Sequence, residues 1–226
     1  MRLGALFSGG KDSTYAVHAA QTQGYEVACL LSILGRSEES LLLHHPNIRW
    51  TALQAQSMGI PQITAESGSD DEDEELESLG ALLAQAVERF GIGGLVHGGI
   101  RSKFQRDRFG RACSDAGLEL VSPLWGADPR LHMESLLDAG FEFLMSSVSA
   151  GGLDESWLGR TVTRGDLAVL GGLSERHGFN LDFEGGEAET FVTDCPLFSR
   201  PVRITSHSKT WDRYRGGFEI LGAELG

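Results

Sequence analysis

Near its start the chain reads Leu3-Gly4-Ala5-Leu6-Phe7-Ser8-Gly9-Gly10-Lys11-Asp12-Ser13. The apolar residues 3–7 predict a buried strand, and residues 13–23 predict a helix that ends at Gly24. Two consecutive glycines between strand and helix allow a tight turn and a close approach of the backbone to a ligand. The first N–H groups of a helix have no partner within it, so they attract an anion. This stretch therefore predicts a strand, a phosphate-binding loop and a helix.

The side chains of this loop suit a phosphate ligand that carries a metal ion. Ser8 and Ser13 can donate hydroxyl hydrogen bonds, and Lys11 adds a positive charge for phosphate oxygens. Asp12 would repel phosphate by itself, but a carboxylate is useful if Mg²⁺ accompanies a pyrophosphate group. Asp12 is therefore a candidate Mg²⁺ ligand.

The first half of the chain alternates strand and helix patterns. The expected strands are 3–7, 26–34, 60–64, 94–97 and 118–121, and the expected helices are 13–23, 47–58, 73–90 and 103–116. This alternation predicts an α/β fold with a parallel sheet and helices on both faces. The segment Pro123-Leu124-Trp125-Gly126 suggests a boundary, with domains at 1–125 and 126–226. We expect the second domain to be a smaller α+β unit, with helices near 131–139 and 166–177 and a strand at 141–148.

Composition excludes several classes of protein. The 226 residues carry a formal net charge of −13, which argues against general nucleic-acid binding. The three cysteines form no C-x-x-C pair, which argues against a disulfide scaffold or a cysteine-rich metal site. No apolar run approaches the roughly 20 residues that span a membrane, and the first residues lack the pattern of a secretion signal. We therefore expect a cytoplasmic protein.

The loop from Ser8 to Ser13 resembles the S-G-G-x-D-S signature of the PP-loop, or N-type ATP pyrophosphatase, superfamily. Its spacing fits neither G-x-x-x-x-G-K-[ST] nor G-x-G-x-x-G. The resemblance implies a HUP-like fold, similar to the adenine nucleotide alpha hydrolases. It also implies an enzyme that splits ATP between the α- and β-phosphates. The ATP-binding residues would be Ser8, Gly9, Gly10, Lys11, Asp12 and Ser13, with Lys11 and Asp12 acting in the chemistry as well.

Further segments resemble one family, the diphthine–ammonia ligases and their archaeal relatives. The main ones are Gly98-Gly99-Ile100-Arg101-Ser102 with Phe104-Gln105-Arg106 and Arg108, Pro123-Leu124-Trp125, and Glu184-Gly185-Gly186-Glu187-Ala188-Glu189-Thr190 leading to Asp194-Cys195-Pro196-Leu197-Phe198. Leu153-Asp154, Trp157-Leu158-Gly159-Arg160, His44 and Asn47 also resemble the archaeal members. The resemblance covers nearly the whole chain, with the motifs in order.

This resemblance implies a reaction. The family amidates diphthine, a modified histidine on translation elongation factor 2, and so forms diphthamide. ATP activates the diphthine carboxylate as an acyl-adenylate and pyrophosphate leaves; ammonia then attacks the carbonyl and AMP leaves. No glutaminase-like nucleophile is evident, so free ammonium is the simpler nitrogen donor. The oligomeric state stays open, a homodimer included.

Roles for several residues follow from the resemblance and from their positions. Glu187 and Glu189 would project to one face of a strand and line the acceptor site or help to hold Mg²⁺. Arg101 would stabilise charge on the α-phosphate. Gly99, Ser102 and Gln105 would contact the nucleotide. Glu184 belongs to the same acidic cluster, and the carboxylates of this cluster or the aromatic face of Trp125 could receive the diphthine trimethylammonium group. His44 or His45 could act as a general acid or base.

The chain departs from the family pattern at five positions. Phe183 stands where glycine is usual, Ala188 replaces an aromatic residue, Gly99 replaces Asp or Ala, Phe104 replaces tyrosine, and Cys195 replaces alanine. Two alternatives to the ligase remain. A PP-loop RNA-modifying enzyme would want paired cysteines and a basic face, which this chain lacks. A nucleotide-binding sensor without ligase activity would keep the phosphate loop alone.

Overall fold

The computed structural model describes residues 1–34, 47–66 and 72–226. Its first sheet has the strand order β3-β2-β1-β4-β5, and every neighbouring pair is parallel. The strands are β1 (Arg2–Leu6), β2 (Glu26–Leu34), β3 (Gln62–Glu66), β4 (Gly94–Val96) and β5 (Glu119–Val121). The parallel sheet expected from the alternation is confirmed.

Helices cover both faces of this sheet, as expected. They are α1 (Lys11–Thr22), α2 (Thr51–Met58), α3 (Glu72–Phe90) and α4 (Lys103–Asp115), with a 3₁₀ turn at Ile48–Trp50. Leu3, Ala5 and Phe7 pack with α1 and α2 on one face. Cys29, Leu31 and Ile33 pack with α3 and α4 on the other face. β2 is a nearly continuous apolar run whose side chains point to both faces of the sheet, so it contributes to both cores.

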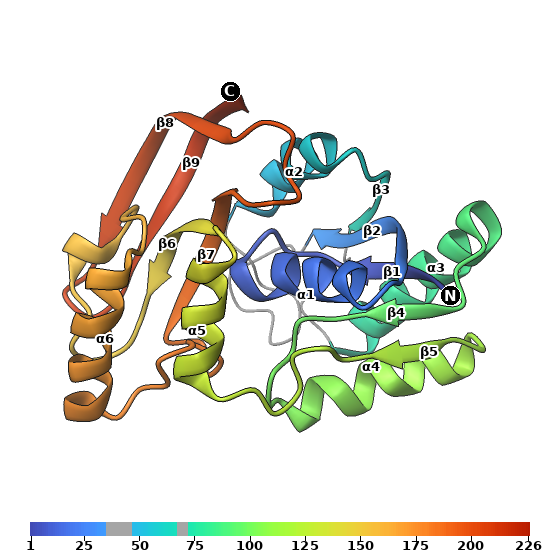
Figure 1. Ribbon diagram of the computed structural model, residues 1–226, viewed down its shortest axis with the longest axis horizontal. Helices are drawn as coiled ribbons and strands as arrows, with labels where there is room; N and C mark the ends of the chain where they lie inside the picture. Colours follow the sequence, from blue (N-terminus) through green and yellow to red (C-terminus); the bar gives the residue numbers. More distant parts are fainter. Residues whose placement is uncertain (35–46, 67–71) are drawn as a thin grey trace.

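The second unit is a four-stranded antiparallel sheet of order β7-β6-β9-β8 with two helices (Figure 1). Its elements are α5 (Pro129–Asp138), β6 (Glu142–Val148), a 3₁₀ turn (Glu155–Trp157), α6 (Arg164–His177), β7 (Ala188–Asp194), β8 (Val202–Trp211) and β9 (Gly216–Leu225). The smaller α+β unit is confirmed, and α5, β6 and α6 match the expected elements. β8 and β9 were not expected, and of β7 only the strand-like alternation of Glu187 and Glu189 was expected. The boundary expected at 125/126 lies between β5 and α5.

Two helices of this unit begin two residues before the expected positions because of their caps. The Asp128 carboxylate accepts the N–H groups of Arg130 and Leu131, with Pro129 in the first turn. Thr163 and Asp166 form a reciprocal capping box at the start of α6. Each cap satisfies N–H groups that the helix cannot satisfy itself.

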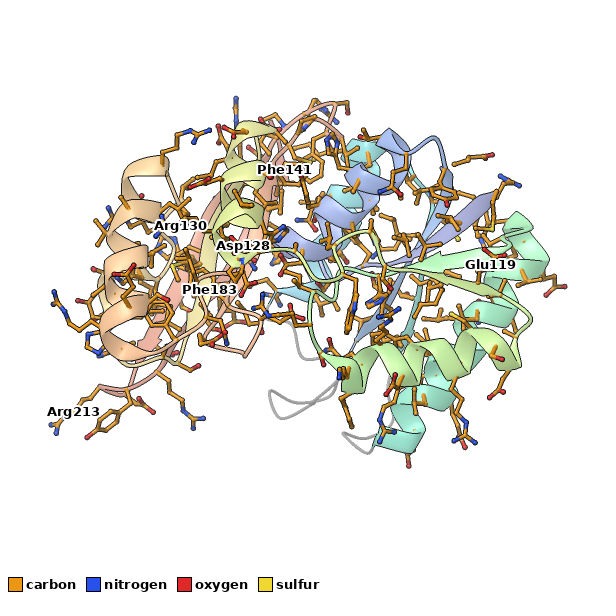
Figure 2. All side chains as sticks on the ribbon, turned by 60° about the horizontal axis from the view of Figure 1, so that its bottom comes forward. Glu119, Asp128, Arg130, Phe141, Phe183 and Arg213 are labelled. Carbon is orange, nitrogen blue, oxygen red and sulfur yellow. The ribbon has the colours of Figure 1, made fainter. Side chains whose placement is uncertain are left out.

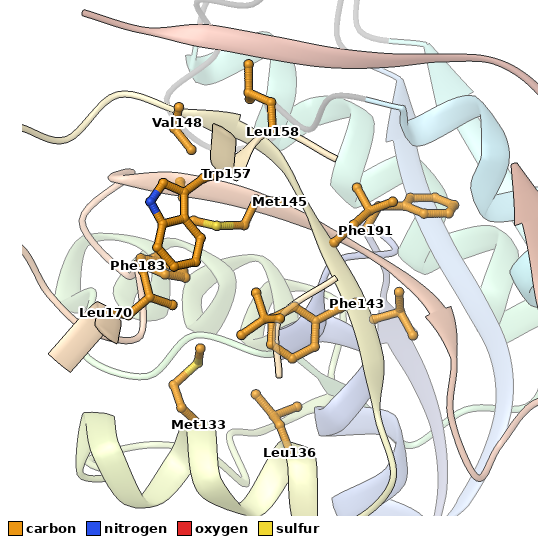
Figure 3. Close-up of a cluster of buried hydrophobic side chains, with 14 of the residues drawn as sticks. Met133, Leu136, Phe143, Met145, Val148, Trp157, Leu158, Leu170, Phe183 and Phe191 are labelled. Atoms are coloured by element: carbon orange, nitrogen blue, oxygen red, sulfur yellow. The ribbon is translucent and has the colours of Figure 1, made fainter. Parts of the chain in front are cut away.

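A separate core holds the second unit together. Phe143, Met145, Trp157, Phe183 and Phe191 belong to one buried cluster beneath α5 and α6 (Figure 3). The turn between β8 and β9, where Arg213 lies, points away from the first sheet, whose edge strand β5 holds Glu119 (Figure 2). The phosphate loop contacts the second unit along β7, through Thr190 and Val192.

Candidate active site

One cavity contains both of the motifs that suggested a function. It has about 920 Å³ of space, including the part open to solvent. Its wall comes from the carboxyl ends of β1 and β4, the start of α1, the first half of α4 and the segment that leads into β7. Ligands of open parallel sheets bind at this edge of the sheet. The fold therefore brings residues about 180 positions apart in the chain to a single site.

The phosphate loop has the tight turn that its glycines predict. Gly9 has a φ of +77°, a conformation that other residues rarely adopt. The hydroxyl groups of Ser8 and Ser13 lie 3.0 Å apart. α1 begins at Lys11, with Gly10 as its N-terminal cap residue. Ser8, Gly10, Lys11, Asp12 and Ser13 all line the cavity, so the helix start faces the ligand space.

The Lys11 side chain is only 3% exposed and already has partners. Its ammonium group lies 2.7 Å from Asp12 Oδ2 and donates to the carbonyl oxygen of Asp182 at 2.6 Å. We expected this charge to be directed at phosphate, whereas it is paired inside the protein. Burial raises the Asp12 pKa, but the Lys11 charge and a hydrogen bond from His132 outweigh burial and hold the pKa below its usual value.

The first glutamate of the predicted acceptor segment has a structural role. Glu184 Oε1 accepts the N–H groups of Ile100 at 2.9 Å, Arg101 at 3.0 Å and Ser102 at 3.3 Å. These donors lie just before α4, where backbone N–H groups lack helical partners. Glu184 therefore fastens the second unit to the loop after β4 through Oε1, and the same residue lines the cavity.

Glu187 and Glu189, which were expected to share one face, are in different surroundings. Glu187 Oε1 accepts from the backbone and side-chain nitrogens of Asn180 at 2.9 and 2.6 Å, and its Oε2 accepts from the Gly185 N–H at 2.8 Å. Glu187 closes this turn and is not part of the cavity wall. Glu189, inside β7, lines the cavity. Of the two, only Glu189 therefore lies where it can meet an acceptor.

The residues after β4 also differ in whether they line the cavity. Gln105 and Gly99 line the cavity, but Arg101 and Ser102 do not. The Arg101 guanidinium donates to Asp182 Oδ1 at 2.7 Å, and this bond raises the Arg101 pKa. The Ser102 hydroxyl accepts the Gln105 N–H at 3.3 Å and caps α4. Arg101 therefore pairs with Asp182, and its expected role at the α-phosphate stays a prediction.

The ring of Trp125, a candidate receptor for the trimethylammonium group, already has a cation over it. The guanidinium carbon of Arg106 lies 4.3 Å from its ring centroid. Trp125 is not part of the cavity wall either. His44 and His45 lie outside the described residues.

The sequence analysis missed three residues of the site. His97, directly after β4, lines the cavity; its Nδ1 accepts the Gly99 N–H at 3.1 Å and its Nε2 lies 2.7 Å from the Ser122 hydroxyl. The Thr190 hydroxyl accepts the Lys11 N–H at 3.1 Å. His132 in α5 binds Asp12. A histidine at the carboxyl end of a strand could have drawn attention. Thr190 ends the motif that begins at Glu184 but was given no role, and no local signal marks His132.

The structure describes the surroundings of three departures from the family pattern. Phe183 has a φ of +62°, a conformation that suits glycine, yet its ring is buried against Phe179 and lies 5.6 Å from the Lys11 ammonium. A Cβ atom at Gly99 would lie 2.9 Å from the His97 ring, so the histidine excludes a larger residue there. A third, Ala188, is buried in the cavity wall, where a larger side chain would take up space.

Family models match both parts of the chain. The model described as diphthamide synthase N-terminal domain matches residues 1–120, and the model described as diphthamide synthase C-terminal domain matches residues 128–225. The chain belongs to the diphthamide synthase family. The family resemblance drawn from the sequence motifs is thereby confirmed.

Relatives of this diphthamide synthase family member are ligases by name. The chain is 30% identical to the diphthine–ammonia ligase of Danio rerio, over 90% of this chain and 86% of that one. It is 29% identical to the Homo sapiens diphthine–ammonia ligase, over 91% and 84% of the two chains. Among solved structures, a predicted subunit of tRNA methyltransferase from Methanocaldococcus jannaschii is 14% identical with a TM-score of 0.45, over 86% of this chain and 97% of that one.

Two features are absent from the described residues. No helix within them is long and apolar enough to cross a membrane. No group of three or more His, Cys, Asp or Glu side chains within residues 1–34, 47–66 and 72–226 could hold a metal ion. A Mg²⁺ ion at Asp12 would therefore depend on phosphate oxygens and water for its other ligands, which is how Mg²⁺ often binds beside nucleotides.

Proposed function

We propose that this chain uses ATP to amidate the diphthine carboxylate of translation elongation factor 2 with ammonium, in the cytoplasm. The reaction would pass through an acyl-adenylate, release AMP and pyrophosphate, and form diphthamide. The observation that carries the proposal is the shared cavity, because residues of the phosphate loop and of the segment before β7 both line it. A carboxylate acceptor and a nucleotide could therefore meet in it.

The wall offers surroundings that suit each part of ATP. Leu6, Ile33, Ile48 and Phe109 form an apolar area for a base. The start of α1 supplies backbone N–H groups for phosphate, with the hydroxyl groups of Ser8 and Ser13 beside them. Asp12 would hold Mg²⁺ together with the phosphate oxygens, and the ion would offset their charge. In this proposal Gln105 and Gly99 contact the nucleotide as well.

The second unit would supply the acceptor side. Glu189 and Phe183 both line the cavity. Both suit a trimethylammonium group, which is attracted to carboxylates and to aromatic faces. The small side chain of Ala188 leaves room beside them. We propose that residues 126–226 bind the acceptor through these three positions and that Arg101 acts only indirectly, through Asp182.

Production of AMP tests this function. The purified chain would be incubated with ATP, Mg²⁺, ammonium and diphthine-bearing elongation factor 2. Release of AMP that requires both ammonium and the modified factor is expected. ATP binding with no AMP under these conditions would favour the sensor alternative, and AMP formation on an RNA acceptor would favour an RNA-modifying enzyme.

A further inference from the structure

A buried histidine from the second unit contacts the phosphate loop. His132 lies in α5, and its Nε2 is 2.7 Å from Asp12 Oδ1. The His132 side chain is 1% exposed. The other oxygen of the same carboxylate, Oδ2, lies 2.7 Å from the Lys11 ammonium. Asp12 is therefore held between two donors that come from different parts of the fold.

The hydrogen bond between His132 and Asp12 has only one possible direction. An ionised carboxylate only accepts, so the His132 Nε2 carries a hydrogen atom and donates it. Aromatic contacts fix the plane of the imidazole ring. The Tyr15 ring meets it edge-on at a centroid distance of 5.6 Å, and Phe141 packs on Tyr15 at 5.3 Å. His132 can therefore hold Asp12 in one orientation.

We infer that His132 is a positioning residue that keeps Asp12 satisfied and so allows the Lys11 ammonium to turn to phosphate. Lys11 lines the cavity, but its charge is used by Asp12 and by the Asp182 carbonyl. A phosphate group would compete for this ammonium. If Lys11 were the sole donor to Asp12, its departure would leave the partly buried carboxylate without any protein donor, with only Mg²⁺ or water as partners, which is costly. This inference rests on the proposed ATP site.

Two substitutions of His132 separate hydrogen bonding from packing. His132→Leu fills the buried position with an apolar side chain but removes the donor. His132→Gln keeps an N–H donor near the position of Nε2. ATP affinity would be measured by calorimetry with Mg²⁺ present and no acceptor. We expect binding about tenfold weaker in His132→Leu, the usual effect of losing a hydrogen bond to a charged group, and within about threefold of the parent in His132→Gln.

His18 provides a matched control. Its ring also contacts Tyr15 and Phe141, at 5.7 and 5.8 Å between centroids, and it donates no hydrogen bond to Asp12 among the described residues. His18→Leu should therefore leave ATP affinity unchanged. Thermal unfolding of all variants would verify that each one folds.

A double-variant cycle shows whether His132 acts through Asp12. In an Asp12→Asn background, His132→Leu should have little further effect on ATP affinity. Equal affinity of His132→Leu and the parent, or an undiminished loss in the Asp12→Asn background, would overturn the inference and leave the ATP site standing. Failure of the parent protein to bind ATP would overturn the site and the inference together.

Discussion

The backbone N–H of Val192 donates a hydrogen bond of 3.0 Å to the carbonyl oxygen of Gly9. This bond joins β7 to the phosphate loop. Gln54 Nε2 reinforces it, because it donates to the carbonyl oxygens of both Gly9 and Val192, at 3.0 and 2.7 Å. The conformation of the phosphate loop thus depends on the second unit as well as on its own glycines.

Substitution of Gly9 should therefore damage the loop in two ways. In Gly9→Ala the new Cβ would lie 2.3 Å from Gln54 Oε1, in addition to the strain of a φ of +77°. The positive φ costs about 1 kcal/mol for alanine, and the clash should add to it. Chemical denaturation should show a loss of at least about 2 kcal/mol, and ATP binding should fall. Gly59→Ala is the control, because Gly59 has a φ of +67° and nothing within 4 Å of a Cβ. Equal losses in both variants would contradict the role of the Gln54 contact.

The backbone strain at Phe183 should show as a difference in stability between two variants, Phe183→Ala and Phe183→Gly. Both Phe183→Ala and Phe183→Gly lose the buried ring, at a cost of about 3 kcal/mol. Glycine also accepts the φ of +62° without strain. We therefore expect Phe183→Gly to be the more stable of the two by about 1 kcal/mol in urea unfolding, the reverse of the order in an ordinary helix or strand. If Phe183→Ala is the more stable, position 183 carries no strain.

His97 should make stability depend on pH in the mildly acidic range. Burial, with a smaller effect of the Arg106 charge, lowers its pKa from 6.5 to about 4. The folded state therefore favours the neutral ring. The contribution of His97 to the free energy of unfolding is complete above pH 6.5 and is lost as the pH falls through about 4. It amounts to about 3 kcal/mol at most. The free energy of unfolding should fall less between pH 6.5 and 4.5 in His97→Asn than in the parent. The same fall in both proteins would exclude His97 as the cause.

Glu189 and Glu187 should differ in their effects on ligation. Glu189→Gln removes a negative charge from the cavity wall and should lower turnover with diphthine-bearing factor by about 10²-fold, while ATP affinity stays within about twofold. Glu187→Gln alters a turn outside the wall, so its main effect should be on stability, about 1 kcal/mol. Steady-state kinetics and thermal unfolding would measure both. A larger loss of turnover in Glu187→Gln than in Glu189→Gln would indicate that Glu187 belongs to the acceptor site.

Local patterns sufficed for much of the fold. The strand–glycine–helix sequence at residues 3–23 and the alternation that follows it predicted every strand of the first sheet and the helices on both faces. The motifs also predicted the family and the two segments that line the cavity. β8 and β9 were missed, and β7 was anticipated only at Glu187 and Glu189, because the pairing of this sheet is antiparallel and partly non-local. In addition, β8 has a mostly polar, exposed surface with few buried side chains.

By itself, the sequence determined that a phosphate loop precedes a helix and that a glutamate-rich segment occurs far along the chain, because helix and strand periodicity and glycine turns are local properties. Only the tertiary structure decided what each charged side chain does. Glu184 binds N–H groups 82 to 84 residues away, Lys11 is paired with Asp12 and the Asp182 carbonyl, and His132 holds Asp12 from a separate helix. A hydrogen bond depends on which groups folding brings within about 3 Å, and sequence spacing carries no information on that.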